Sequence, residues 1–177
     1  MTDIFSKIAK IYNEMGHHHY GEGVSQIEHS VQCARLAVED GERSDMVVAA
    51  LLHDIGHLIG EVKLGHGHFH HDHVGADFLS HYFPPGVTEP VRLHASAKRY
   101  LCTTEAGYID SLSEASRHSL DHQGGLMTED EITSFRAEPF YEQAIRLRRW
   151  DDEAKDEKLA STPFNSFSGY VEDVCGA

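Results

Sequence analysis

The apolar positions along the chain recur mostly at the spacing of an α-helix. A capping-box pattern at Ser25 and Glu28 opens one amphipathic stretch, and Gly41 is placed to stop it. Residues 46–52 (Met-Val-Val-Ala-Ala-Leu-Leu) are apolar at every position. Because a helix that is apolar all round is buried, this segment predicts a central helix of the fold.

Further helices are predicted over residues 71–82, 87–101, 113–120 and 139–155. Gly56 and Gly60 weaken the helical signal after residue 52, and the Gly- and His-rich residues 60–70 predict a loop. Gln123-Gly124-Gly125 predicts a turn. Alternating β-branched segments, which are typical of strands, are scarce. We therefore expect an all-α helical bundle.

The chain shows no internal repeat and no Pro- or Gly-rich linker. Residues 1–177 are therefore expected to form a single domain, long enough to bury a core without disulfide bonds. From about residue 161 onward, Pro163 and several serines interrupt the helical pattern. This tail is expected to be poorly defined and to pack across the surface.

The composition narrows the possible partners. Lys and Arg number 15 against 29 Asp and Glu, so the formal net charge is −14. Such a field repels phosphate backbones and acidic lipids, so neither nucleic acid nor a membrane is expected as a partner. Cys33, Cys102 and Cys175 are widely separated, and no apolar run approaches the roughly 18 residues of a membrane span. We expect a cytoplasmic protein without a signal peptide.

Histidine is unusually frequent, with 15 residues, and His53 adjoins an aspartate. His53 and Asp54 directly follow the apolar residues 46–52, where access of solvent is limited. A buried Asp is costly without a cation or hydrogen bonds, so the pair is a candidate for metal binding. The structural alternative is an Asp that caps the helix end beside a hydrogen-bonded core histidine.

Two residues on other predicted helices extend this pair to a set. His29 lies on the helix after Ser25, and Asp151 follows Trp150 on the late apolar helix. A His, a His-Asp pair and a distant Asp on separate helices resemble the pattern of the HD-domain superfamily, whose bundle holds a metal with these four side chains. The resemblance predicts His29, His53, Asp54 and Asp151 as metal ligands.

Two further histidines predict a second metal position. His71 begins one predicted helix, and His94 lies within the next. If both are ligands, Asp54 bridges the first metal to a second one. Imidazole and carboxylate ligands with open positions suit iron that binds oxygen or a substrate. Interpretations without a metal stay open for both histidines. Residues 66–73, which include His71 and contain five histidines, also fit a solvated loop. His94 also fits a histidine that is hydrogen-bonded within its helix.

Lys98 follows His94 by four residues, so both side chains point to the same helix face. A cation beside a metal site is placed to pair with an anionic substrate such as a phosphonate. His57 shares a face with His53 in the same way. The alternative for Lys98 is a solvated cation next to Arg99, the commoner position for a lysine.

In these positions the chain resembles the PhnZ-type HD-domain diiron oxygenases, which cleave organophosphonates. The resemblance runs in the same order from about residue 16 to about residue 155. It rests on Gly21-Glu22 through Gln26-Ile27-Glu28-His29-Ser30, Leu52-His53-Asp54-Ile55-Gly56-His57, His71 with Val74-Gly75-Ala76-Asp77, His94 with Ala97-Lys98-Arg99-Tyr100-Leu101, Ser113 to Arg117, Gln123-Gly124-Gly125, and Arg149-Trp150-Asp151.

The resemblance implies a mixed-valence Fe(II)/Fe(III) pair that uses dioxygen to break the carbon–phosphorus bond of a 1-hydroxyalkylphosphonate. The related myo-inositol oxygenase uses a similar six-ligand site. The implied iron ligands are His29, His53, Asp54, His71, His94 and Asp151. His57 and Lys98 are implied as catalytic residues that contact the substrate, and Ser116 contacts the phosphonate or its hydroxyl. Gln123 and Arg148 are implied to complete the substrate site.

One position departs from the family pattern. The family has a Tyr that can occupy the substrate site as an iron ligand, three residues before an acidic residue that faces the substrate amine. Glu22 matches this acidic residue, but His19 stands three positions before it and Tyr20 two. Either side chain, or neither, takes the gating role, and Tyr20 is expected at the substrate.

The expected substrate is 2-amino-1-hydroxyethylphosphonate or an N-methylated relative of it, up to the trimethylated form. Glu22 would attract a primary amine by charge, and Tyr20 an N-methylated one through a cation–π contact. The expected products are inorganic phosphate and glycine or a betaine.

Two other functions stay open from the sequence. HD domains commonly hydrolyse phosphate esters or nucleotides, and the four core ligands suit that reaction. Against it, His71, His94 and the Lys98-Arg99-Tyr100 motif match the oxygenases. A histidine-rich metal-binding or regulatory module would explain residues 66–73 but not the ordered ligand set on five helices. The sequence is silent on the oligomeric state.

Overall fold

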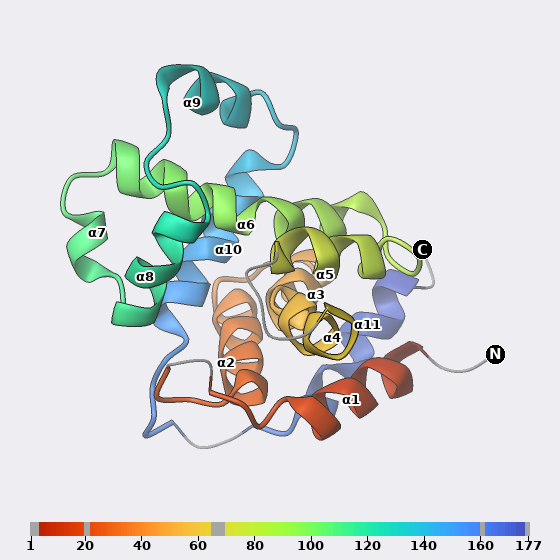
Figure 1. Cartoon of the computed structure of the whole chain (residues 1–177). Coiled ribbons are helices and arrows are strands. Elements are labelled where there is room, and N and C mark those ends of the chain that lie inside the picture. The colour runs from red at the N-terminus through yellow and green to blue at the C-terminus, as the bar shows by residue number, and fades with distance from the viewer. Residues whose placement is uncertain (1–3, 20–21, 65–69, 160–161, 176–177) are drawn as a thin grey trace.

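The computed structural model describes residues 4–19, 22–64, 70–159 and 162–175, and these ranges contain helices and no strand (Figure 1). The elements are α1 (Ile4–Met15), α2 (Gln26–Glu39), α3 (Ser44–Leu52), α4 (Ile55–Leu64), α5 (His71–Leu79), α6 (Pro85–Thr104), α7 (Tyr108–Ser111), α8 (Glu114–His122), α9 (Glu129–Arg136), α10 (Tyr141–Glu153), the 3-10 turn η1 (Phe164–Phe167) and α11 (Ser168–Cys175). The predicted all-α class is confirmed.

The apolar segment at residues 46–52 forms most of α3, and every one of its side chains is buried. α3 packs against α2, α6, α10 and α11, and Figure 1 shows it inside the ring of other helices. The prediction of a central buried helix is therefore confirmed. The segment that follows α3 carries His53 and Asp54, so this candidate pair begins at the core.

The predicted start of α2 is also confirmed. Glu28 N donates to Ser25 Oγ at 3.4 Å, and Ser25 N donates in return to Glu28 Oε2 at 2.8 Å, which is a complete capping box. Ser113 caps α8 by accepting from Ser116 N at 3.1 Å. These caps fix the first turns of two helices whose side chains face the candidate site.

The structure differs from the expected loop at residues 60–70. α4 continues to Leu64, so the four residues before the undescribed 65–69 are helical. Gly56 does not end the helix, because it lies in the first turn of α4, where it allows a close contact with α5. Of the histidines at 66–73, His71 begins α5, while His66 and His68 lie outside the described residues.

Several helices were not predicted at all. α1 buries Phe5, Ile8 and Tyr12 on one face, a helical spacing that the sequence analysis passed over. α9 begins with a capping box at Thr128 and Glu131, the same signal that marks α2. The short α7 has no comparable signal.

The expectation of a poorly defined tail is wrong for residues 164–175, which form η1 and α11. Phe164 and Phe167 of η1 are buried in the main core, as are two valines of α11. The Phe164 ring lies 4.6 Å from the ring of Tyr12, centroid to centroid. The apolar contacts with α1 therefore order this segment, although its Pro and Ser content suggested the opposite.

The predicted turn at Gln123-Gly124-Gly125 is confirmed. Gly124 and Gly125 have positive φ angles of 106° and 67°, a conformation that favours glycine. Arg99 on α6 holds the turn, since its Nε donates to Gly125 O at 2.9 Å. Arg99 also pairs with Glu131 at 2.7 Å, so α6, the turn and α9 are tied together.

Candidate metal centre and substrate cavity

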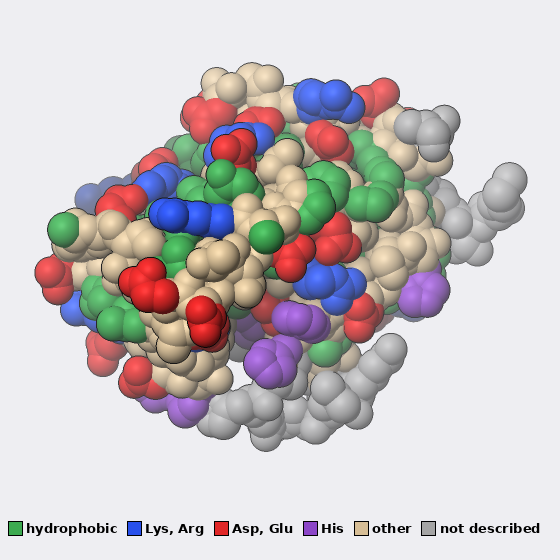
Figure 2. Space-filling view, turned by 90° about the horizontal axis from the view of Figure 1, so that it is seen from above, with side chains coloured by type: hydrophobic (Ala, Val, Ile, Leu, Met, Phe, Trp, Pro, Cys, Tyr) green, Lys and Arg blue, Asp and Glu red, His purple; other side chains and the backbone are tan. Residues whose placement is uncertain are grey.

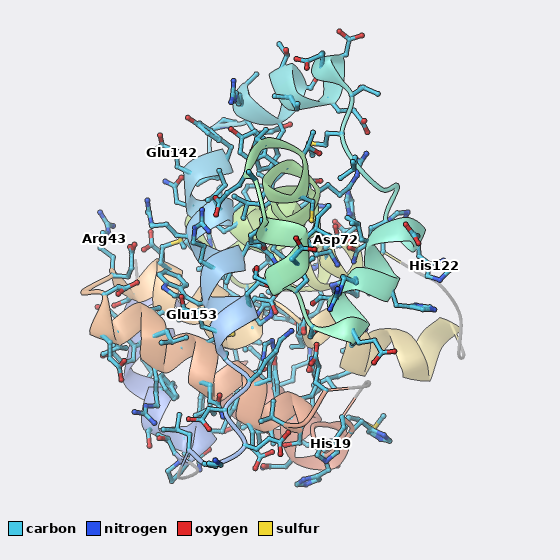
Figure 3. All side chains as sticks on the ribbon, turned by 90° about the vertical axis from the view of Figure 1, so that its left-hand side faces the viewer. His19, Arg43, Asp72, His122, Glu142 and Glu153 are labelled. Carbon is cyan, nitrogen blue, oxygen red and sulfur yellow. The ribbon has the colours of Figure 1, made fainter. Side chains whose placement is uncertain are left out.

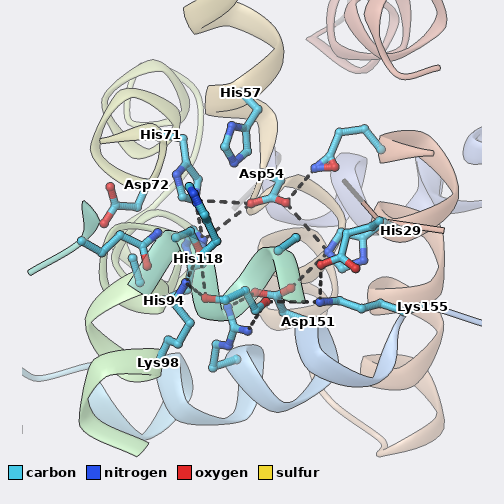
Figure 4. Close-up of a pocket in the computed structure, with 18 of the residues that line it drawn as sticks. His29, Asp54, His57, His71, Asp72, His94, Lys98, His118, Asp151 and Lys155 are labelled. Carbon is cyan, nitrogen blue, oxygen red and sulfur yellow. Dashed lines mark hydrogen bonds and ion pairs between the residues drawn. The ribbon is translucent and has the colours of Figure 1, made fainter. Parts of the chain in front are cut away.

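Asp54 presents each of its two carboxylate oxygens to a different pair of imidazole rings (Figure 4). Its Oδ2 lies 3.8 Å from His29 Nε2 and 3.5 Å from His53 Nε2. Its Oδ1 lies 3.5 Å from His71 Nε2 and 3.6 Å from His94 Nε2. A carboxylate with one pair of nitrogen donors at each oxygen has the geometry to bridge two cations.

Backbone carbonyl groups orient three of these rings. The Nδ1 atoms of His29, His53 and His94 lie 2.8, 2.9 and 2.6 Å from the carbonyl oxygens of Ala154, Ala50 and Val91. Because a carbonyl oxygen only accepts, each Nδ1 carries the proton and each Nε2 is left to face Asp54.

The approach of two imidazole nitrogens tests whether this donor set fits a metal. His29 Nε2 and His53 Nε2 lie 3.3 Å apart, and the Nδ1 proton of each ring is already donated to a carbonyl. Two lone pairs at this distance repel each other unless a positive charge, a proton or a metal ion, lies between them. The nitrogen and carboxylate donors therefore fit a transition metal.

Asp151 on α10 adds a second carboxylate to the His29–His53 pair. Its Oδ1 lies 3.2 Å from His29 Nε2 and 3.9 Å from His53 Nε2. Its Oδ2 accepts from Arg148 Nη1 at 2.6 Å. Burial favours the protonated acid, but the Arg148 guanidinium and His29 outweigh it and hold the pKa of Asp151 well below its usual value. Asp151 is therefore ionised at neutral pH, which is the form that can ligate a metal.

The protonation states of Asp54 and His71 also suit a metal. Burial tends to raise the pKa of Asp54, but the neighbouring histidines, His53 most of all, outweigh it and hold that pKa well below its usual value. Burial lowers the pKa of His71 well below its usual value, and the neighbouring His57 lowers it further. A neutral imidazole and an ionised carboxylate are the ligating forms.

The local fold explains how these side chains meet. His53 and Asp54 lie in the turn where α3 ends and α4 begins. An added Cβ at Gly56 would lie 1.8 Å from the carbonyl oxygen of His71, so α4 and α5 approach as closely as only a glycine allows. This approach brings His71 beside Asp54.

A cavity of about 310 Å³ opens at these ligands. The predicted site residues that line it are Glu22, His29, Asp54, His57, His71, His94, Lys98, Ser116, Gln123, Arg148 and Asp151. His53 lies beneath, fully buried, and reaches the site through its Nε2. Tyr20 lies outside the described residues, so its predicted place at the substrate, and the choice between Tyr20 and His19 as the gate, stay predictions.

Histidines surround the entrance of the cavity. His19 and His122 both line it and are both exposed, and Figure 3 shows them toward the outside of the molecule. Figure 2 shows histidine side chains below the middle of this face and toward its right and lower left edges, with acidic and basic side chains between them. The cavity therefore opens to solvent between polar side chains.

Lys98 is buried at the side of the cavity, although lysine is seldom buried. Its Nζ donates to Ser119 Oγ at 2.7 Å and to Ser116 O at 3.3 Å. Burial, together with the charge of Arg148, lowers the pKa of Lys98 to about 8. The solvated alternative for Lys98 is therefore wrong, and the side chain is a buried cation at neutral pH.

Four more predicted residues line the same cavity. The Arg148 guanidinium donates to Ser116 Oγ at 3.3 Å and also pairs with Asp152. The ring of His57 stacks on that of His71, with centroids 3.9 Å apart. Gln123 Oε1 is buried with no hydrogen-bond partner among the described residues. An orphaned acceptor at a cavity wall is placed to receive a proton donor from a ligand.

The structure adds residues that the sequence analysis did not assign. Gln26 Nε2 donates to Asp54 Oδ2 at 2.7 Å, and so orients the bridging carboxylate. Lys155, just beyond α10, donates to Glu22 Oε1 at 2.8 Å. Gln26 belongs to one of the motifs on which the family resemblance rests. No sequence pattern indicates a role for Lys155, because its partner is 133 positions away in the chain.

Cys33 and the surface histidines form further groups of ligating atoms. Cys33 Sγ lies 3.9 Å from His29 Nε2, behind the first imidazole pair. His70, Asp72 and His73 lie within metal-binding distance of one another at the start of α5. His70 and His73 are exposed, so this group belongs to the surface rather than to the buried ligand set.

The described helices include none that is long and apolar enough to span a membrane. The helical fold and the two pairs of imidazoles around Asp54 define a helical protein of the HD class with a candidate metal centre, and the family comparison agrees. The model of the HD domain matches residues 27–153. The chain therefore belongs to the HD-domain family, in its PhnZ-type branch.

Similar curated proteins indicate which kind of HD-domain protein this chain resembles. The chain is 41% identical over 172 residues to hydroxymethylphosphonate dioxygenase of Gimesia maris, covering 94% of this chain and 86% of the relative. It is 37% identical over 179 residues to the glycine-betaine-forming [1-hydroxy-2-(trimethylamino)ethyl]phosphonate dioxygenase of Leisingera caerulea, covering 96% and 89%. An uncharacterized protein of Acanthamoeba polyphaga mimivirus is 38% identical over 155 residues, covering 84% and 71%.

Proposed function

We propose that this protein is an oxygenase that uses dioxygen to cleave the carbon–phosphorus bond of a 1-hydroxyphosphonate. The observation that carries the proposal is the position of Asp54, whose two oxygens face separate pairs of imidazole nitrogens at 3.5–3.8 Å. The two dioxygenase relatives act, by their names, on phosphonates. A site able to hold two metals suits both oxygenases and hydrolases, and the names of these relatives support oxygenase chemistry over hydrolysis.

We propose two iron ions as the cofactor, in the Fe(II)/Fe(III) state. His29, His53 and Asp151 would hold one, His71 and His94 the other, and Asp54 would bridge them. When bound, the iron pair would supply the redox chemistry with dioxygen. Nitrogen and carboxylate donors without a cysteine in the ligand set support iron over softer metals.

The side chains around the cavity are suited to hold the substrate. Lys98 is a buried cation, and the orphaned Gln123 Oε1 is an acceptor for a hydroxyl proton. Together with Ser116 and Arg148, Lys98 would neutralise and orient the phosphonate. The imidazole of His57 would hold the C1 hydroxyl, since its ring is fixed by stacking on His71.

The overall reaction balances without an external reductant. One hydroxyphosphonate and one dioxygen contain the atoms of one carboxylic acid and one inorganic phosphate. The carbon next to phosphorus is oxidised, dioxygen is reduced, and the carbon–phosphorus bond is replaced by carbon–oxygen and phosphorus–oxygen bonds. With an amine on the neighbouring carbon, the acid produced is glycine or, after trimethylation, glycine betaine.

We propose 2-amino-1-hydroxyethylphosphonate and its N-methylated relatives as substrates. Glu22 supports this proposal, because it is a carboxylate on the cavity wall and can pair with a cationic amine. The trimethylated substrate in the name of one relative is consistent with it.

The test is to purify the protein anaerobically, count its iron and measure phosphate release from hydroxyphosphonates with and without oxygen. We expect two irons per chain, and phosphate release that needs both oxygen and the half-reduced pair. Phosphate release from nucleotides without oxygen would instead establish a phosphohydrolase. Failure to release phosphate from either class of substrate would contradict both enzymatic functions and favour a metal-binding module.

We also propose that the whole chain acts as one domain in a reducing compartment such as the cytoplasm. α1 and α11, which lie outside the matched residues 27–153, contribute buried side chains to the same core as α3. The three cysteines are free, which is typical of a reducing environment.

A further inference from the structure

The ammonium of Lys155, a residue that lines the cavity, lies among three side-chain oxygen atoms. Its Nζ is 2.8 Å from Glu22 Oε1, 3.2 Å from Ser113 Oγ and 3.3 Å from Ser116 Oγ. An ammonium has three protons to donate, so three acceptors at these distances satisfy it. We call Glu22, Ser113 and Ser116 the ammonium site.

The backbone holds Lys155 at this place from both sides. The carbonyl oxygen of Ala154, the preceding residue, accepts from His29 Nδ1 at 2.8 Å. Asp156, the following residue, exchanges two hydrogen bonds with the Gln32 amide, each of 3.0 Å. The main chain on either side of Lys155 is thus anchored to α2, and only its side chain is left to move.

The ammonium site is continuous with the metal ligands. Ser116 Oγ accepts from both Lys155 Nζ and the Arg148 guanidinium, each at 3.3 Å. Arg148 in turn donates to Asp151, which faces His29. A substrate held between Lys98 and the metal ligands therefore has the ammonium site within the same cavity.

We propose that Lys155 is a specificity-determining residue, because its ammonium competes with the cationic group of a substrate for the ammonium site. The proposal rests on the proposed function and concerns the end of the substrate away from phosphorus. Glu22 carries one negative charge, and two cations on one carboxylate repel each other at close range. A substrate amine must therefore displace Lys155 before it can bind there.

Lys155 is able to leave. Its side chain is 17% exposed and that of Glu22 23%, so the pair lies at the solvent side of the cavity rather than in the core. The displaced ammonium would be hydrated, which keeps the cost of displacement moderate. A phosphonate without an amine leaves the Lys155–Glu22 pair intact.

The geometry of the ammonium site also predicts how well different amines replace the hydrogen bonds of Lys155. A primary ammonium replaces all three hydrogen bonds that Lys155 makes. A trimethylammonium group has no N–H to donate, so it would not replace the hydrogen bonds that Lys155 donates to the two serine hydroxyls. Such a group would be bound instead by an aromatic ring, and Tyr20, which is expected to make that contact, lies outside the described residues.

The test compares the Lys155→Met variant with the wild-type protein, both loaded with iron. Dissociation constants are measured by calorimetry without oxygen, so that no turnover occurs, for 2-amino-1-hydroxyethylphosphonate and for hydroxymethylphosphonate. We expect Lys155→Met to bind the amine about fivefold more tightly, because the competing cation is gone. The affinity for hydroxymethylphosphonate should change by less than about twofold.

Lys158→Met is the matched control, since Lys158 is exposed in the same segment and does not line the cavity. It should change neither constant. Lys155→Gln, which removes the charge but keeps a hydrogen-bond donor, should shift the preference in the same direction as Lys155→Met. It serves as the second variant if Lys155→Met fails to fold.

Equal changes for both ligands in Lys155→Met, or weaker binding of the amine alone, would overturn the proposal. Phosphate release in air separates this failure from failure of the proposed function. If the wild-type protein releases phosphate, but Lys155→Met has the same preference for the amine over hydroxymethylphosphonate, only the proposed role of Lys155 is wrong. If wild-type protein releases phosphate from none of the hydroxyphosphonates, the proposed function itself is wrong.

Discussion

Asp54 is the residue on which the candidate metal centre depends. It is the one described carboxylate within 4 Å of all four ligand imidazoles, and Gln26 holds its Oδ2 in place. Each metal would therefore lose an oxygen ligand if this side chain were removed. The His53-Asp54 motif carried this prediction from the sequence, because its position after an apolar helix implied a costly buried charge.

Replacing Asp54 with Ala should remove both metals, since the remaining imidazoles lack the shared negative charge. We expect the iron content of anaerobically purified protein, measured by mass spectrometry, to fall at least about tenfold. Asp77→Ala is the control, because Asp77 is an exposed carboxylate on α5 that pairs with Arg92 outside the site. Retention of two irons in Asp54→Ala would exclude a bridging role.

Lys98 should make phosphonate binding depend on pH. Its pKa of about 8, lowered by burial and by Arg148, means that it is charged below pH 8 and loses its charge as the pH rises. The dissociation constant of the phosphonate, measured anaerobically by calorimetry, should therefore rise above pH 8, by up to about tenfold per pH unit.

Two Lys98 variants separate charge from structure. Lys98→Arg keeps its charge at high pH, so the pH dependence should disappear. Lys98→Met should retain iron and bind the phosphonate weakly at every pH. An iron content that fell in Lys98→Met as far as in Asp54→Ala would place Lys98 with the metal rather than the substrate.

At the scale of helices, the contact between α4 and α5 determines where His71 lies. Gly56 and Gly75 face each other across this contact, and a Cβ at Gly56 would come within 2.9 Å of Gly75 N as well as clashing with His71. In the sequence, Gly56 indicates only a weakened helix. Its role in packing was invisible there, because the partner helix begins 15 residues later.

Gly56→Ala should push α5 away and displace His71. We expect the free energy of unfolding, measured with urea, to fall by about 1–3 kcal/mol, and iron to be lost preferentially from one of the two positions. Gly169→Ala in α11 is the control, since a Cβ there meets nothing within 4 Å. It should stabilise the protein by up to about 1 kcal/mol. Full iron content in a destabilised Gly56→Ala would contradict the link to His71.

At the scale of the whole molecule, side chains of α1 and of η1 pack against each other in the same core. Phe164 stacks on Tyr12 and Phe5 of α1, and the Tyr12 hydroxyl donates to Leu51 O of α3 at 3.1 Å. The helix that leads into His53 and Asp54 is thus supported by residues 39 and 113 positions away. This support is structural and lies away from the cavity.

Phe164→Ala should therefore lower stability without changing the site. We expect the free energy of unfolding to fall by about 3–5 kcal/mol through the cavity left between α1 and α3, while the folded protein keeps its iron. Leu159→Ala, at a side chain that is 40% exposed, should change it by less than about 0.5 kcal/mol. Equal effects of the two substitutions would show that the tail does not contribute to the core.

By itself, the sequence determined the helical class, the buried helix at residues 46–52 and the set of side chains able to ligate metal. These depend on periodicity, capping and residue type, which are local. Only the tertiary structure decided that Asp54 lies between two imidazole pairs, that residues 164–175 are ordered, and that Lys155 occupies the site beside Glu22. The physical reason is that each of these depends on contacts between segments far apart in the chain, where no local pattern records which side chain will be the neighbour.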